Sequence, residues 1–93
     1  MYSIVYTKRA KNDIAKLKAA GLDKKAKSLI DLMRENPYQS PPTFKKLKGD
    51  LGGALSRRIN IQHRLVYQVI EDEKTIKIIM IMLGLPLRPS ATV

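Results

Sequence analysis

Four basic side chains crowd a short stretch with the composition of β-strands, SRRINIQHRLVYQV, residues 56–69. They are Arg57, Arg58, His63 and Arg64. A guanidinium presents a planar fork of N–H donors that suits a pair of phosphate oxygens. Arginines that lie on one face would therefore predict a phosphate-binding site, with charge stabilisation as its chemistry.

The parity of strand pairing decides which face each side chain takes. The numbers of facing residues in an antiparallel pair sum to a constant, and an even sum keeps the apolar residues together. One face then collects Ile59, Ile61, Leu65, Tyr67 and Val69. The other collects Ser56, Arg58, Asn60, Gln62, Arg64 and Gln68. An odd sum would mix charge into the apolar set, so we predict the even one, with Arg58 and Arg64 adjacent on the polar face.

Other basic residues extend this predicted phosphate site. Lys45, Lys46 and Lys48 precede the hairpin and, with Arg57, are predicted to contact a nucleic-acid backbone as further positive charges. The alternative is an arginine pair neutralised by carboxylates from elsewhere in the chain. His63 falls on the apolar face near the turn, where a packed structural histidine is the more common finding than a catalyst.

The net charge of +10, from 18 Lys and Arg against 8 Asp and Glu, favours a polyanionic partner. Nucleic acid, an anionic membrane surface and an acidic protein all fit, and so does a solvated basic surface without a partner. A chain without cysteine and with a single histidine has few side chains that bind metals, so we expect no metal and no other cofactor. The absence of cysteine also suits a reducing compartment, the cytoplasm. The longest apolar run, residues 78–87, is too short to cross a bilayer.

The pattern along the 93 residues predicts one domain over residues 1–83, followed by an atypical tail over 84–93. A strand over 2–6 leads to a helix over 8–20, capped by Thr7 and stopped by Gly21. A second helix is capped by Asp23 and ends at Asn36-Pro37. Residues 36–53 have the composition of a loop, and strands are expected over 54–60, 63–71 and 75–83.

Four lysines of the two expected helices are predicted to lie on solvated faces. They are Lys16, Lys24, Lys25 and Lys27.

The segment LKGDLGGALSRRINIQHRLVYQV, residues 47–69, resembles the core motif of the YoeB (Txe) branch of the RelE/ParE superfamily of toxins from toxin-antitoxin modules. The NPYQSPP and EDEKTIKII segments support the resemblance, which covers about residues 1–79. It implies an α+β fold with two N-terminal helices packed on a four- to five-stranded, antiparallel-dominated sheet in β-α-α-β-β-β order. It also implies an endoribonuclease that cuts mRNA in the ribosomal A site, and an acidic antitoxin partner. No membrane association is expected, because the lysines of the helices do not lie opposite a large aromatic-rich face. A homodimer stays open, since the apolar tail could present an edge to another subunit.

The resemblance also assigns roles. Arg64 matches the family's catalytic arginine, and Arg58 and Lys48 match neighbouring basic positions. The family reads FEKLKGDL where this chain reads FKKLKGDL, so Lys45 replaces a carboxylate. The family's last strand ends approximately IIRMWTHY, whereas Gly84 and Leu85 stand here in place of His and Tyr.

Such cleavage needs a base for the 2′-OH, positive charge at the phosphate, and an acid for the leaving oxygen. The expected function is therefore an mRNA endonuclease by descent, with its activity reduced or lost. The alternative is an inactive protein that binds RNA, the ribosome or an antitoxin, in the last case as a corepressor. An inhibitor of DNA gyrase like ParE ranks below both.

Overall fold

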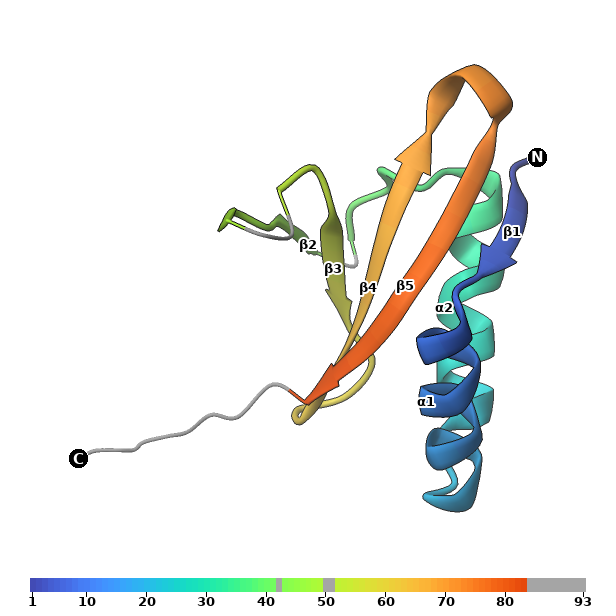
Figure 1. Ribbon diagram of the computed structural model, residues 1–93, viewed down its shortest axis with the longest axis vertical. Helices are drawn as coiled ribbons and strands as arrows, with labels where there is room; N and C mark the ends of the chain where they lie inside the picture. The colour runs from blue at the N-terminus through green and yellow to red at the C-terminus, as the bar shows by residue number, and fades with distance from the viewer. Residues whose placement is uncertain (42, 50–51, 84–93) are drawn as a thin grey trace.

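The computed structural model describes residues 1–41, 43–49 and 52–83. Two helices pack on one face of a five-stranded sheet whose strand order is β1-β5-β4-β3-β2 (Figure 1). Along the chain the elements are β1 (Ser3–Tyr6), α1 (Lys8–Ala19), α2 (Asp23–Glu35), β2 (Phe44–Lys46), β3 (Leu55–Arg58), β4 (His63–Ile70) and β5 (Thr75–Leu83). The predicted α+β class is confirmed, with β1 parallel to β5 and the other neighbouring strands antiparallel.

The helices begin and end close to where their sequences predict. The Thr7 hydroxyl accepts a hydrogen bond from the Ala10 amide at 3.0 Å, which confirms the predicted cap of α1, and Gly21 follows the helix with a positive φ of 76°. Asp23 does not cap α2 but is its first residue, placing a carboxylate in the first turn. Among the described helices, none is long and apolar enough to cross a membrane.

The predicted even register of the hairpin is confirmed, because Arg58 faces Arg64 and Leu55 faces Tyr67. Ile61 departs from its predicted place on the apolar face, since it lies in the turn between β3 and β4 and is 73% exposed. The prediction of a loop over residues 36–53 was incomplete. It contains β2, an edge strand of three residues, which is too short for its alternation to stand out between prolines and glycines.

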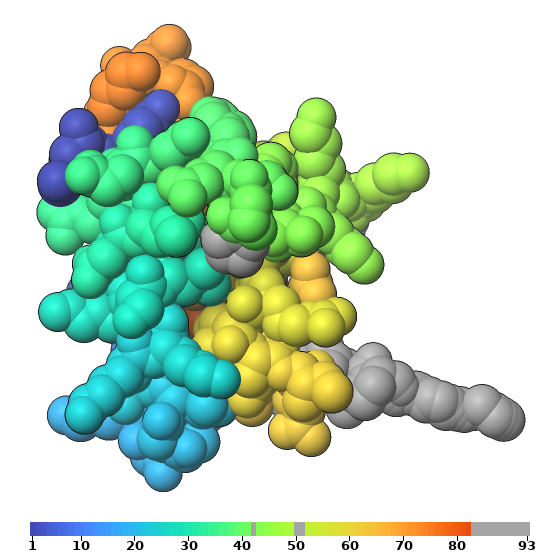
Figure 2. All heavy atoms as spheres, turned by 180° about the vertical axis from the view of Figure 1, so that it is seen from behind, coloured from blue at the N-terminus to red at the C-terminus, as the bar shows by residue number. Residues whose placement is uncertain are grey.

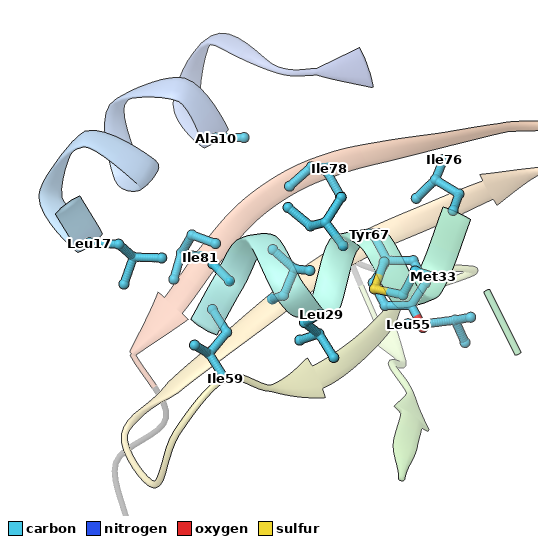
Figure 3. Close-up of a cluster of buried hydrophobic side chains, with 13 residues drawn as sticks. Ala10, Leu17, Leu29, Met33, Leu55, Ile59, Tyr67, Ile76, Ile78 and Ile81 are labelled. Carbon is cyan, nitrogen blue, oxygen red and sulfur yellow. The ribbon is translucent and has the colours of Figure 1, made fainter. Parts of the chain in front are cut away.

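The core lies between the helices and the inner face of the sheet (Figure 3). A bulge in β5 keeps that face apolar, because Tyr67 pairs with Ile78 whereas Val66 pairs with Met80. The extra residue, Ile79, allows both Ile78 and Ile81 to be buried although they are three positions apart. The Thr7 hydroxyl donates to the Ile79 carbonyl oxygen at 2.6 Å, so the start of α1 bonds to the bulge.

Arg57 is completely buried, and its predicted role as a surface contact for RNA is therefore corrected. It faces Leu65 on the inner side of the sheet. Its Nε donates to the Tyr67 hydroxyl at 3.0 Å, its Nη2 donates to the Pro37 carbonyl oxygen at 2.9 Å, and its guanidinium lies 4.9 Å from the centre of the Phe44 ring. One side chain thus connects β4, the segment after α2, and the edge strand β2.

A second contact fixes the segment after α2, and it comes from Glu71 in the turn between β4 and β5. The Tyr38 hydroxyl donates to a Glu71 carboxylate oxygen at 3.0 Å, and Tyr2 donates to the same carboxylate. Partial burial and this bond to Glu71 raise the pKa of Tyr38 to about 12, and the bonds from Tyr38, Tyr2 and Lys74 lower the pKa of Glu71. Arg57 and Glu71 therefore fix the chain on its way from α2 to β2.

We expect Arg57→Lys to lower the free energy of unfolding by about 2 kcal/mol, because an ammonium cannot reproduce the planar fork that bonds Tyr67 and Pro37 and stacks on Phe44. Urea unfolding followed by circular dichroism measures this loss. The matched control is Arg58→Lys, one residue along and exposed, which should change stability by less than about 0.5 kcal/mol. Equal effects of the two substitutions would show that Arg57 is not a structural connection.

Candidate nucleic-acid interface

The face of the sheet away from the helices has a hollow of about 360 Å³ lined by Thr43, Lys45, Arg58 and Arg64. Three neighbouring strands supply its cations. Arg58 and Arg64 face each other across β3 and β4, and Lys45 faces Ser56 across β2 and β3. Strand alternation puts all of them on the side opposite Leu55 and Tyr67. The hollow is therefore a consequence of the predicted register together with the unpredicted strand β2.

Arg64 is the most firmly positioned cation of the hollow. Its side chain is partly buried, and its Nε donates to the Ser56 hydroxyl at 3.2 Å. Ser56 is itself fully buried, so the acceptor has a fixed place. Burial lowers the pKa of Arg64, and the neighbouring charge of Arg58 lowers it further. An anion placed between the two guanidiniums would offset their repulsion by its opposite charge.

Arg58 is exposed, and like charges that face each other across neighbouring strands repel. In the described part of the chain the salt bridges are Arg9–Asp13 and Lys74–Glu71, and neither involves a cation of the hollow. The described residues that line the hollow include no carboxylate either. Its electrostatics therefore favour an anionic ligand, and the geometry of the paired guanidiniums suits a phosphate.

The six predicted basic site residues lie in four different places. Lys45, Arg58 and Arg64 come together in the hollow. Lys46 faces Leu55, so alternation places it on the other side of β2, where it lines a separate hollow with Leu47. Lys48 is exposed in the loop after β2, and Arg57 lies in the core. Gly84 and Leu85 lie outside the described residues.

His63 lies near the hairpin turn, on the side of the sheet that packs against α1, as predicted. It is half-buried, its Nδ1 lies 3.1 Å from the Asn60 side-chain oxygen, and it lines a hollow with Asp13 and Lys16 of α1. Sequence reasoning missed two hydroxyls in or beside the hollow of Lys45, Arg58 and Arg64. Thr43 shares a face with Lys45 only once β2 is recognised, and Ser56 was placed on the polar face without its bond to Arg64.

The hollow can hold and stabilise an anion but, within its described lining, it has no group suited to moving protons. Guanidiniums remain charged at all ordinary pH values, and an ammonium has no lone pair with which to accept a proton. Three cations around one phosphate would favour the extra negative charge of a pentacoordinate state. The site thus contains half of the chemistry needed to cleave a phosphodiester.

Comparison with known proteins connects this geometry to a family. A family model described as "YoeB-like toxin of bacterial type II toxin-antitoxin system" matches residues 6–82. Toxin YoeB of Escherichia coli K12 is 43% identical over 49 residues, which cover 53% of this chain and 58% of that protein. Toxin YoeB of Streptomyces coelicolor is 40% identical over 53 residues, covering 57% of this chain and 63% of that protein. These matched segments span less than two thirds of the curated relatives.

Solved structures extend the similarity over nearly the whole fold. A YoeB/ParE toxin from Agrobacterium tumefaciens superposes with a TM-score of 0.79 at 27% identity, covering 89% of this chain and 99% of that one. The toxin chain matched in the YoeB–YefM complex from Staphylococcus aureus gives a TM-score of 0.75 at 30% identity, covering 91% and 99%. With most of its length matched by the family model, this chain belongs to the YoeB-like toxins of bacterial type II toxin-antitoxin systems.

Proposed function

We propose that this toxin binds mRNA on the ribosome through the hollow of Lys45, Arg58 and Arg64, and that its endonuclease activity is weakened because that hollow has cations without a proton acceptor. The observation that carries the proposal is the pairing of Arg58 with the Ser56-bound Arg64 beside Lys45. Family membership supplies the expected reaction, and the residues of this chain supply the reason for its reduced rate.

The proposed reaction is transfer of a phosphoryl group within one RNA strand. The 2′ oxygen loses its proton and forms a bond to the adjacent phosphorus, while the bond from phosphorus to the 5′ oxygen breaks and that oxygen gains a proton. The products are a 2′,3′-cyclic phosphate and a 5′-hydroxyl. Arg58 and Arg64 stabilise the pentacoordinate phosphate, whereas water must accept and donate the protons that a carboxylate and an imidazole would otherwise transfer.

The partners follow from the same proposal. A solved relative from Staphylococcus aureus is described as a YoeB–YefM toxin-antitoxin complex, and another structure from that organism as a YoeB dimer. We therefore propose an acidic antitoxin as the partner of this chain of net charge +10, and a homodimer as its free state. We also propose the cytoplasm as its location, because a chain without cysteine suits a reducing compartment.

A second candidate function is binding without cleavage, either to RNA on the ribosome or to an antitoxin in a corepressor complex. The position of Lys45 favours it, because Lys45 lines the phosphate hollow itself and so places an ammonium where the family pattern has a carboxylate. A cleavage assay separates the two candidates, because only the first of them cuts RNA.

Arg64→Ala should reduce mRNA cleavage by about 100- to 1000-fold, because it removes a positioned positive charge at the reacting phosphate. Primer extension on mRNA translated in a purified system measures the cut. Lys46→Ala is the matched control, since Lys46 sits on the neighbouring strand but on its other side, and it should cut like the parent. Cleavage that survives Arg64→Ala would refute the phosphate assignment.

Replacing Lys45 by Glu, Gly84 by His and Leu85 by Tyr, with the chain ending at residue 85, should raise cleavage by at least about 100-fold, because general acid and base groups each contribute that much or more. The control carries the same terminus with Lys46→Glu in place of Lys45→Glu, which gives the same net charge. Equal cleavage by the original and restored chains would contradict the proposed weakening. Cleavage only by the restored chain would favour the binding-only function for the original.

Ser56→Ala should lower kcat about tenfold in whichever version cuts, because Arg64 loses the hydroxyl that orients its Nε. KM should change by less than about twofold, since the charge that attracts RNA remains. Ser3→Ala, an exposed serine on β1, serves as the control. A rise in KM with unchanged kcat would mean that Ser56 supports binding rather than the transition state.

A further inference from the structure

Side chains join the turn between β4 and β5 to the segment that leads into β2. The exposed carboxylate of Glu71, in that turn, accepts a hydrogen bond from the Tyr38 hydroxyl at 3.0 Å. It also accepts from the hydroxyl of Tyr2, which precedes β1. Figure 2 shows the segment after α2 in green, the start of the chain in blue and this turn in orange at one end of the molecule. Tyr38 therefore ties its segment to a turn that is distant in sequence.

The ring of Tyr38 continues this link to β2. Its centre lies 6.5 Å from the centre of the Phe44 ring, with 59° between the two planes, which is the geometry of a favourable aromatic pair. Phe44 is the first residue of β2, and the Arg57 guanidinium lies 4.9 Å from its ring centre. Two residues thus hold Phe44, one of them fixed in the core and the other through Glu71.

The edge of the sheet needs such contacts. β2 pairs with β3 over three residues, and a strand this short is not stable through its backbone hydrogen bonds alone. The described residues between Tyr38 and β2 are exposed, so they bury little surface that would fix the strand. The contacts of Phe44 therefore decide much of the position of β2.

The position of β2 matters because two of the residues that line the hollow of the candidate interface lie next to Phe44. They are Thr43 and Lys45. Alternation places Phe44 on the inner side of the sheet and its two neighbours on the side of the hollow. A displacement of Phe44 would carry both neighbours with it, since all three share one short stretch of backbone. It would leave the arginine pair on β3 and β4 in place.

The hydrogen bond between Tyr38 and Glu71 persists near neutral pH. Partial burial and the bond to Glu71 raise the pKa of Tyr38 to about 12, so its hydroxyl keeps the proton that it donates. The bonds from Tyr38, Tyr2 and Lys74 lower the pKa of Glu71, so the carboxylate keeps its charge. A charged acceptor makes the bond stronger than one between neutral groups.

We propose that Tyr38, held by Glu71, is a positioning residue for the hollow, because through Phe44 it holds Thr43 and Lys45 where both contact bound RNA. The inference rests on the proposed function in naming RNA as the ligand. It adds a residue on the inner side of the sheet to those on which RNA affinity depends. Tyr38 itself does not touch RNA, so its effect should vanish when the two residues that it positions are removed.

Direct stacking of an RNA base on Tyr38 is the competing explanation, since this ring is 46% exposed and aromatic rings bind single-stranded nucleic acid. The charge around the ring disfavours it. Glu71 bonds the hydroxyl, and Asp72 and Glu73 follow in the same turn. Their carboxylates would repel the phosphates on either side of a stacked base. Positioning therefore agrees better with the surroundings of Tyr38.

A double-mutant cycle on the full chain tests the proposal, with affinity measured by fluorescence anisotropy of a labelled single-stranded RNA at physiological salt. Tyr38→Phe removes the hydroxyl and keeps the ring, and it should weaken RNA binding about three- to fivefold. In a chain that carries Thr43→Val with Lys45→Gln, the same substitution should change affinity by less than about 1.5-fold. Equal losses in the two backgrounds would overturn the proposal, because Tyr38 would then act on RNA directly or on the whole fold.

Matched variants separate the contact with β2 from the rest of the network at Glu71. Tyr2→Phe removes a hydroxyl from the same carboxylate at β1, and it should weaken RNA binding by less than about 1.5-fold. Glu71→Gln and Glu71→Leu remove the same charge, but only glutamine keeps an oxygen that accepts from Tyr38. The leucine variant should bind RNA about threefold more weakly than the glutamine variant. Equal affinities within either pair, Tyr2→Phe with Tyr38→Phe or the two Glu71 variants, would contradict a positioning role.

Amide hydrogen exchange measures the positioning without RNA. Tyr38→Phe should raise the exchange rates of the β2 amides at least about threefold relative to those of β5, and Tyr2→Phe should not. Unchanged exchange in β2 would overturn the inference whatever the RNA affinities are. If Thr43→Val with Lys45→Gln leaves RNA affinity unchanged, the hollow is not the RNA site and the proposed function fails. Exchange in β2 then still decides whether Tyr38 positions that strand.

Discussion

The buried guanidinium of Arg57 connects the core on the inner side of this small sheet with its edge strand, β2. Through Tyr67, Pro37 and Phe44 it connects a central strand, the segment after α2 and the edge strand β2. A three-residue edge strand makes too few backbone hydrogen bonds to be stable alone, so its place depends on such side-chain contacts. Because β2 carries Lys45, an arginine in the core positions one wall of the surface hollow that Lys45 lines with Arg58 and Arg64.

The sequence was sufficient to predict the parts that depend on alternation and capping. The apolar residues of β3 and β4 required an even register, and that register places Arg58 against Arg64 as observed. The same parity also puts Arg57 on the inner face with Leu65. Its assignment to the RNA surface followed its charge and ignored its position, although position is the stronger constraint in a strand with one buried face.

Other features could not be predicted because they depend on contacts between distant segments. The apolar run of β5 has no alternation, so it does not reveal the bulge at Ile79. The carbonyl oxygen of Ile79 accepts a hydrogen bond from the Thr7 hydroxyl, which lies far away in the sequence. A groove beside α2 forms only when Lys24 and Lys25 meet Arg58 across the fold. Helical periodicity correctly shows both lysines to be exposed, but it cannot show what they are exposed beside.

The three arginines of this hairpin differ in how firmly they are held. Arg57 is fixed in the core and serves the fold. Arg64 is bonded to the buried Ser56 and so presents its charge in one direction, which suits a reacting phosphate. Arg58 is exposed and borders two hollows, so of the three arginines it is the one least constrained by the fold.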